Sequence, residues 1–318
     1  MNISLLEPLS VPEALIEELS EPIKKAGHNF TYYNTKTTDV DELIKRSAGQ
    51  DVVMIANNKY PASVINASKD LKMLAVAFTG IDHVDTAACK ENGVTVCNCS
   101  GYSNTCVAEQ TIGMAISLLR YFSSCDKAVR QGGTSLGLTG TEIAGKRVGI
   151  IGCGEIGTKV AKLFLAFDAE VVAYARHERE NVKALGVKYV SFDELLSTSD
   201  IITLHTPNNA STKGLVGKEE FSKMKKSAVF INCARGPIVD NKALADALNE
   251  GKLKAAAIDV YDMEPPIPSD YPLLNAKNLL LTPHVAFLTE EAMIRRAYIE
   301  FGNVTAYLEG NPRNICPL

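Results

Sequence analysis

The stretch VGIIGCGEIGTKVAKLFLAFDAEVVAYAR, residues 148–176, decides the fold of this chain. It begins with an apolar run that predicts a buried strand, and Gly152, Gly154 and Gly157 follow in the spacing G-x-G-x-x-G. A helical pattern comes next, and a second apolar run closes the unit. Because the glycines stand between a strand and a helix, the pattern predicts a dinucleotide-binding turn.

Each glycine has a physical task in such a turn. Gly152 permits the tight bend, Gly154 lets the main chain approach a pyrophosphate, and Gly157 lets the helix pack closely on the strand. Glu155 and Ile156 lie beside them, where the free N–H groups of a helix start can bind phosphate. The competing interpretation is an ordinary tight turn between a strand and a helix.

Length and composition limit the class of protein. With 318 residues the chain is long enough for two domains, because single cores seldom grow beyond about 250–300 residues. Its net charge of -4 argues against a nucleic-acid or membrane-surface partner. No apolar run approaches the roughly 18 residues of a membrane span, and the acidic N-terminus lacks the basic start of a signal peptide. We therefore expect a cytoplasmic protein.

Eight cysteines are scattered along the chain without a CxxC pair. A chain of this size does not need a disulfide scaffold, so we expect free thiols. Cys97 and Cys99 form a CxC, which is better explained by alternate faces of one strand than by a metal site. We predict no metal centre.

The first third of the chain alternates apolar runs with helical patterns, which predicts a parallel sheet covered by helices. The expected strands cover residues 2–6, 30–33, 51–56, 74–78 and 94–97, and the expected helices cover residues 12–26, 40–47 and 62–68. This pattern resembles a small doubly wound domain that lacks the glycine motif.

A long helix over residues 103–121 and a Gly- and Thr-rich loop over residues 130–145 lead into the nucleotide unit. Beyond it the alternation continues, with strands expected at residues 187–190, 201–205, 228–232, 255–260 and 279–281, and helices at residues 191–197, 218–224, 241–250 and 289–307. We expect the last helix to return to the first domain.

The predicted fold is therefore α/β, with two doubly wound, Rossmann-like domains, parallel sheets and an active-site cleft between them. The substrate domain would be discontinuous, covering residues 1–102 and 286–318, and the dinucleotide-binding domain would cover residues 103–285.

Three side chains stand just past three predicted strands of the second domain: Arg235, Glu264 and His284. Ligands collect at the carboxyl ends of the strands in open α/β sheets, so we expect these side chains to converge. Together they suit carbonyl chemistry, with the histidine as general acid, the carboxylate as its partner and the arginine as an anion ligand. Taken singly, each could also be a surface or core residue without a catalytic role.

The segments around these residues read NCARGPIVD, AAIDVYDMEPP and LLLTPHVAF. With GCGEIG, AFTGIDHVD and NTCVAEQTIGMAISLLR, they resemble the pattern of the D-isomer-specific 2-hydroxyacid dehydrogenase family over nearly the whole chain. The resemblance implies that His284 protonates a substrate carbonyl while NAD(P)H delivers hydride. It also implies that Glu264 fixes the His284 ring and that Arg235 binds the 2-oxo acid.

The resemblance extends to the binding residues. It implies that Thr79, Gly80 and Ile81 hold the substrate carboxylate and that domain closure excludes water. The cofactor would contact the glycine motif and the following strand ends, at Arg176, His177, Thr206, Pro207, Cys233, Ala234, Arg235, Asp259, His284 and Ala286. A homodimer formed through the nucleotide domain, with contacts from residues 103–121 and 130–145, is a further implication.

The end of the second strand of the nucleotide unit reads Tyr174-Ala175-Arg176-His177. An NAD-specific unit usually carries an acid there, which grips the ribose hydroxyls, but Ala175 fills the position. Arg176 would instead pair with a 2′-phosphate. We therefore favour NADP(H), with NAD(H) as the alternative if this segment is only a solvated turn.

The sequence indicates the type of reaction more clearly than it indicates the substrate. The polar loop at residues 57–61 would suit glyoxylate or hydroxypyruvate, whereas Phe287 would suit an apolar side chain, and Tyr102 and Leu288 could line the pocket. A formate- or phosphite-dehydrogenase-like enzyme is an alternative within the fold. A dinucleotide-sensing, corepressor-like binding protein is an alternative of another class.

Overall fold

The computed structural model describes residues 1–318 and divides into two compact units. Unit 1 comprises Met1–Ser103 and Leu288–Leu318, and unit 2 comprises Asn104–Phe287. The structure confirms the α/β class, because each unit is built on an all-parallel sheet. The assignment of unit 1 to the substrate and unit 2 to the cofactor remains a prediction.

The sheet of unit 1 has the strand order β2-β1-β3-β4-β5, so the chain crosses over between β2 and β3. Its strands are β1 (Asn2–Leu5), β2 (Asn29–Tyr32), β3 (Val52–Ile55), β4 (Met73–Val76) and β5 (Thr95–Asn98). All residues of β3 and β4 are buried, which explains why their sequences are continuous apolar runs rather than alternating ones.

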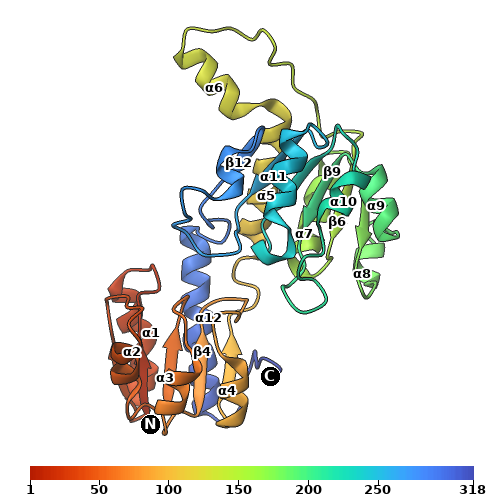
Figure 1. The fold of residues 1–318 in the computed structure, drawn as a ribbon. Coiled ribbons are helices and arrows are strands. Elements are labelled where there is room, and N and C mark those ends of the chain that lie inside the picture. The colour runs from red at the N-terminus through yellow and green to blue at the C-terminus, as the bar shows by residue number, and fades with distance from the viewer. The chain divides into compact units, whose positions relative to one another are not determined.

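Five helices belong to unit 1 (Figure 1): α1 (Glu13–Lys25), α2 (Val40–Ser47), α3 (Ala62–Ala67), α4 (Thr86–Glu91) and α12 (Glu290–Leu308). Helix α4 was not predicted, because it has only six residues and no clear apolar stripe. Its start is nevertheless encoded locally, because the Asp85 side chain accepts a hydrogen bond from the Ala88 amide at 2.9 Å.

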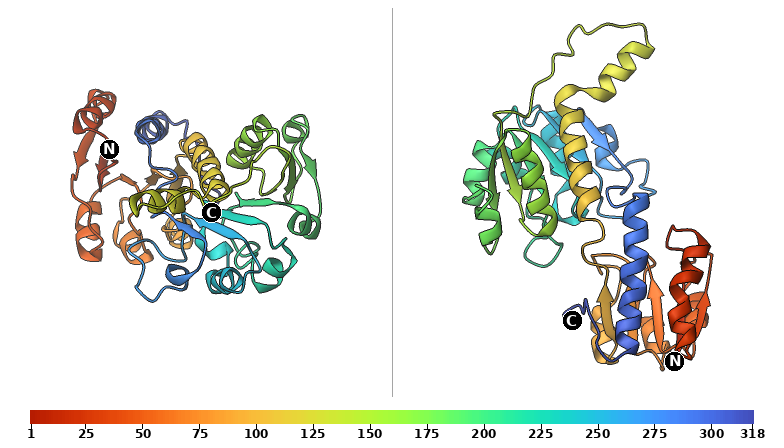
Figure 2. Two further views of the ribbon diagram at one scale, coloured as in Figure 1. Left: turned by 90° about the horizontal axis from the view of Figure 1, so that it is seen from above. Right: turned by 180° about the vertical axis from the view of Figure 1, so that it is seen from behind.

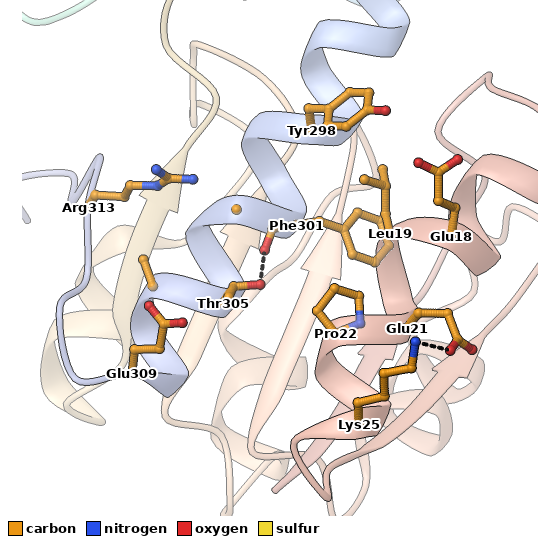
Figure 3. Close-up of a pocket in the computed structure, with 12 residues that line it drawn as sticks. Glu18, Leu19, Glu21, Pro22, Lys25, Tyr298, Phe301, Thr305, Glu309 and Arg313 are labelled. Atoms are coloured by element: carbon orange, nitrogen blue, oxygen red, sulfur yellow. Dashed lines mark hydrogen bonds and ion pairs between the residues drawn. The ribbon is translucent and has the colours of Figure 1, made fainter.

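Helix α12 packs against α1 and β4, so the end of the chain completes the unit that the beginning of the chain forms (Figure 2). An open groove runs between α1 and α12, with Leu19, Pro22 and Phe301 among its apolar lining residues. Figure 3 shows charged side chains around this lining, with Arg313 near α12. A Cβ atom at Gly302 would lie 2.0 Å from Nη2 of Arg313, so the glycine leaves room for the guanidinium.

The sheet of unit 2 has seven parallel strands in the order β12-β11-β10-β9-β6-β7-β8. Their bounds are β6 (Arg147–Ile151), β7 (Glu170–Tyr174), β8 (Lys188–Tyr189), β9 (Ile201–Leu204), β10 (Val229–Asn232), β11 (Ala255–Ile258) and β12 (Leu279–Leu281). The order reverses between β6 and β9, and a reversal of this kind is where doubly wound sheets bind ligands.

The helices of unit 2 are α5 (Asn104–Arg120), α6 (Phe122–Arg130), α7 (Glu155–Ala166), α8 (Glu180–Lys183), α9 (Phe192–Thr198), α10 (Lys218–Lys223) and α11 (Asn241–Asn249), with 3-10 turns η1 (Gly236–Ile238) and η2 (Pro272–Asn275). Helices α6 and α8 were not predicted. Helix α7 begins at Glu155, so Gly157 lies within it. No helix of the structure combines the length and the apolar character that a membrane crossing requires.

Candidate active site

The glycine turn between β6 and α7 is built as its spacing predicts. Gly152 has a φ of 95°, and a Cβ atom there would lie 2.6 Å from the carbonyl oxygen of His205. A Cβ atom at Gly157 would lie 2.1 Å from the carbonyl oxygen of Gly152. At Gly154, by contrast, a Cβ atom would meet nothing within 4 Å, which leaves space for a ligand against the main chain. The turn therefore fits a dinucleotide pyrophosphate.

Two arginines stand near the end of β7 and differ in their partners. Arg176 donates to the hydroxyl of Ser211 at 2.7 Å and forms no salt bridge. Arg179 pairs with Glu155 of α7 at 2.8 Å, so a carboxylate already balances its charge. Ala175, between β7 and Arg176, has no side chain that could bind ribose hydroxyls. His177 is exposed beside them.

The residues that follow β9 contact the glycine turn, since the His205 carbonyl lies directly against Gly152. The His205 ring is hydrogen-bonded through Nε2 to the hydroxyl of Thr203 at 2.9 Å. Burial lowers the pKa of His205 to about 3, so the ring is neutral at physiological pH. Thr206 and Pro207 follow it, and the Pro207 carbonyl accepts a hydrogen bond from Thr212 at 2.6 Å, which closes the loop.

The turn of Arg235 is held by Asn232, which was not predicted to belong to the site. The buried Asn232, at the end of β10, accepts a hydrogen bond from the Ala234 amide at 2.9 Å and donates to the Arg235 carbonyl at 3.0 Å. One amide side chain thus spans the turn from Cys233 to Arg235. An Asn at a strand end, directly before a turn, is a local signal for this role, because its side chain can bond main-chain groups two or three residues further on.

Glu264 and His284 form the pair that the sequence predicted. The carboxylate oxygens of Glu264 lie 3.0 and 3.2 Å from Nδ1 of His284. His284 has a φ of 57°, a left-handed conformation that is unusual for a residue with a side chain, and its amide donates to the Thr282 carbonyl at 3.0 Å. The Phe287 ring lies edge-on to the imidazole, with centroids 5.3 Å apart. This geometry leaves Nε2 as the nitrogen that can face a substrate.

Asp259, at the end of β11, organises the main chain around His284. Its fully buried carboxylate accepts hydrogen bonds from the Thr282 hydroxyl at 2.5 Å and from the amides of Val285 and Ala286, both at 2.9 Å. The family resemblance implies that both Asp259 and Ala286 contact the cofactor. The structure shows in addition that these two residues bind each other, which holds the loop that carries His284.

Cys233 is a buried thiol rather than an exposed ligand. Its Sγ lies 3.5 Å from Sδ of Met114 in α5, and burial raises its thiol pKa. A cofactor contact at this position would therefore use the main chain of Cys233 and Ala234.

In unit 1, the predicted carboxylate loop follows β4. The carbonyl of Thr79 accepts a hydrogen bond from Asn98 at 2.8 Å, and the carbonyl of Ile81 accepts one from Val84 at 3.0 Å. The amides of Gly80 and Ile81 donate to no group in the structure, which leaves two N–H donors for an anion. Phe78 precedes the loop and packs edge-on against Tyr102, with centroids 6.1 Å apart.

The loop after the neighbouring strand β3 is held by Glu7. One carboxylate oxygen of Glu7 accepts hydrogen bonds from the amides of Ala56 and Asn58, at 2.8 and 2.9 Å. The Asn58 side chain is 1% exposed, and neither of its amide atoms has a partner. A buried amide without a partner costs free energy unless a water molecule or a ligand group completes its hydrogen bonds.

Comparison with known proteins places the chain in a family. Residues 112–286 match the family model described as D-isomer specific 2-hydroxyacid dehydrogenase, NAD binding domain. The chain is 33% identical over 300 residues to a hydroxypyruvate reductase of Blautia hydrogenotrophica, a match that covers 92% of this chain and 93% of that protein. It is 36% identical over 303 residues to a D-3-phosphoglycerate dehydrogenase of Archaeoglobus fulgidus, covering 92% of this chain but only 57% of that longer protein.

Among solved structures, an acyclic imino acid reductase in complex with NADPH and D-Arg has a TM-score of 0.90 and 28% identity, with 100% of each chain covered. The family model covers more than half of this chain, and the hydroxypyruvate reductase matches along nearly its whole length. The chain therefore belongs to the D-isomer-specific 2-hydroxyacid dehydrogenase family, and it is an oxidoreductase that uses a nicotinamide dinucleotide to interconvert 2-oxo and 2-hydroxy acids.

Proposed function

We propose that this enzyme reduces a small polar 2-oxo acid, such as hydroxypyruvate or glyoxylate, and that it prefers NADPH to NADH. The observation that carries the reaction is the His284–Glu264 pair, with Nδ1 3.0 Å from the carboxylate, beside the Arg235 loop of the same sheet. The alternatives within the fold, formate or phosphite oxidation, need no general acid for a carbonyl oxygen. The pair is better suited to the reduction of a carbonyl.

In the proposed mechanism, Nε2 of His284 donates a proton to the carbonyl oxygen of the 2-oxo acid. Glu264 accepts the Nδ1 hydrogen of the same ring, which fixes the ring orientation and stabilises the imidazolium. The guanidinium of Arg235 binds the substrate anion with its planar fork. When bound, the nicotinamide supplies the hydride. In the oxidation direction His284 takes the proton back at the same atom.

For the cofactor, the support lies in the contrast between the two arginines after β7. Arg179 is balanced by Glu155, whereas Arg176 is held by the neutral Ser211 and keeps its charge for an anion. A 2′-phosphate is such an anion, and Ala175 removes the acid that would repel it. NAD(H) is the alternative, and it is tested by comparing turnover with NADPH and with NADH.

For the substrate, we propose that the amides of Gly80 and Ile81, together with Thr79, bind the carboxylate. The unpartnered amide of Asn58, on the loop after the adjacent strand, supports a substrate with a hydroxyl or carbonyl group beyond the 2-oxo acid. Hydroxypyruvate carries such a hydroxyl. An apolar 2-oxo acid would leave the buried amide unsatisfied.

We further propose a cytoplasmic homodimer. All eight cysteines are free, as expected for a reducing compartment. Helix α6 buries none of its residues and projects from unit 2 (Figure 1), and Phe122, Val129 and Leu136 are 55%, 76% and 92% exposed. Apolar side chains this exposed are typical of a surface that a second copy covers.

The experiment that tests the function is a steady-state panel with the purified enzyme. Glyoxylate, hydroxypyruvate, pyruvate and longer apolar 2-oxo acids are each assayed with NADPH and NADH at equal concentration. We expect the highest kcat/KM for hydroxypyruvate or glyoxylate with NADPH. A strong preference for NADH would refute the cofactor proposal, and a preference for apolar acids would refute the substrate proposal. The absence of turnover, with a stable bound partner protein, would favour a dinucleotide-sensing role.

A further inference from the structure

The catalytic carboxylate stands on a segment without regular structure. Between the end of β11 and η2, residues 259–271 form neither helix nor strand, yet Glu264 must meet His284 within hydrogen-bonding distance. The segment carries a side-chain anchor two residues before Glu264. The hydroxyl of Tyr271 donates to Oδ1 of Asp262 at 2.5 Å. This bond therefore links the two ends of residues 262–271, the stretch that contains Glu264.

The anchor is itself rigid. Tyr271 is 4% exposed and directly precedes η2, which packs against α11. Its ring lies edge-on to the ring of Tyr261, with centroids 5.8 Å apart and an angle of 80°. Both rings belong to the hydrophobic core of unit 2. The Tyr271 hydroxyl therefore has a defined position to which Asp262 is tied.

The backbone at Tyr261 and Asp262 also meets the loops of the other two catalytic residues. A Cβ atom at Gly236, next to Arg235, would lie 1.8 Å from the carbonyl carbon of Tyr261, so the two main chains are in direct contact. The Tyr261 hydroxyl donates to the Thr282 carbonyl at 2.9 Å, and that carbonyl also accepts from the His284 amide. The loops of Arg235, Glu264 and His284 thus converge on one dipeptide.

We propose that Tyr271 is a positioning residue for the reaction, which acts through Asp262 to hold Glu264 against Nδ1 of His284. The proposal rests on the catalytic roles proposed above for Glu264 and His284. Tyr261 contributes to the same positioning, because its hydrogen bond to the Thr282 carbonyl connects this segment to the His284 loop.

The hydroxyls of Tyr261 and Tyr271 are both suited to act as hydrogen-bond donors at every assay pH. Burial raises the pKa of Tyr261 to about 12, and burial together with the bond to Asp262 raises the pKa of Tyr271 as well. Both hydroxyls therefore keep their protons, and their hydrogen bonds, over the whole pH range in which the enzyme would be assayed.

The test is the Tyr271→Phe variant, which removes one oxygen and preserves the ring. We expect kcat for 2-oxo acid reduction to fall about tenfold, a part of the contribution of general acid catalysis. The KM for NADPH is expected to stay unchanged. The imidazole signal of His284, one of five histidines, is followed by NMR during a pH titration and assigned with His284→Gln. Its midpoint is expected to move to lower pH, because a displaced carboxylate stabilises the imidazolium less.

A double-mutant cycle separates positioning from general damage. Asp262→Ala should reproduce the loss, the double variant should be no worse than either single variant, and Asp262→Asn, which retains an acceptor oxygen, should restore most of kcat. Asp270→Ala removes the same charge from the same segment, at a side chain without a hydrogen bond or ion pair, and serves as the matched control.

Three outcomes would overturn the proposal: an unchanged His284 titration in Tyr271→Phe, additive losses in the cycle, or a lower melting temperature that accounts for the loss. The NMR titration does not depend on turnover. If the wild-type enzyme reduced no 2-oxo acid while the His284 midpoint still moved, the proposed substrate class would fail and the positioning role would stand.

Discussion

Oε2 of Glu264 lies 3.0 Å from Nδ1 of His284, and the two residues follow adjacent parallel strands, β11 and β12. The side chain of Glu264 is 70% exposed, whereas that of His284 is 21% exposed. The ring is therefore the more enclosed member of the pair. Excluding water from such a pair strengthens the interaction, since water screens the charges.

Replacement of Glu264 by Gln is expected to reduce kcat for 2-oxo acid reduction by about 10- to 100-fold, because the imidazolium loses its anionic partner. The loss should grow as the pH rises, since the proton on His284 is then held less firmly. His284→Ala should cost orders of magnitude more. The measurement is a pH–rate profile between about pH 5 and pH 9. NADPH binding, followed by fluorescence, should persist in both variants, and near-normal turnover of His284→Ala would exclude the assigned role.

Arg235→Lys keeps a positive charge but loses the planar fork, so we expect kcat/KM for the 2-oxo acid to fall about 100-fold or more. Asn232 holds the main chain of this turn, and its bonds do not involve the guanidinium, so the fold should survive. Thermal unfolding and NADPH affinity are the controls. A lysine variant as active as the wild type would show that simple charge, not bidentate binding, recognises the substrate.

Arg176→Ala should raise the KM for NADPH about tenfold or more and leave the KM for NADH nearly unchanged, because only NADPH carries the 2′-phosphate. The matched control is Arg179→Ala, which removes the same charge from an arginine that Glu155 already balances. Ser211→Ala, which removes the anchor of Arg176, should give a smaller effect in the same direction. Equal losses with the two cofactors would contradict the assignment.

The glycine turn offers a pair of variants with opposite expectations. Gly157→Ala forces a Cβ atom to within 2.1 Å of the Gly152 carbonyl oxygen, so we expect a loss of about 2–3 kcal/mol in the free energy of unfolding. Gly154→Ala meets no atom within 4 Å, so it should leave the stability of the cofactor-free protein intact and weaken cofactor binding. Urea unfolding and cofactor titration distinguish them. Equal stability of the two variants would contradict the packing argument.

His205 should make the enzyme sensitive to acid. Its pKa is lowered from 6.5 to about 3 by burial, so the unfolded chain takes up a proton between these values that the folded protein does not. This contribution to stability is fully present above pH 6.5 and is lost as the pH falls toward 3, at up to about 1.4 kcal/mol per pH unit. His205→Gln should flatten the dependence, measured as the free energy of unfolding in urea.

Much of the site could be read from the sequence because its signals are local. The glycine spacing, the apolar strands and the residues just past them follow from backbone geometry over a few residues, and they predicted the Arg235, Glu264 and His284 loops and the family. The short helices α4, α6 and α8 were not predicted, because few of their residues face a core and their apolar periodicity is weak.

The sequence by itself thus determined two parallel α/β units, a dinucleotide turn and the residue types of a carbonyl-reducing site. Only the tertiary structure decided how those residues are held, through the bond of Asp259 to the Ala286 amide and the bond of Tyr271 to Asp262. The residues that these bonds join are 27 and nine positions apart in the sequence. Their formation depends on packing between segments, which no local pattern of residues records.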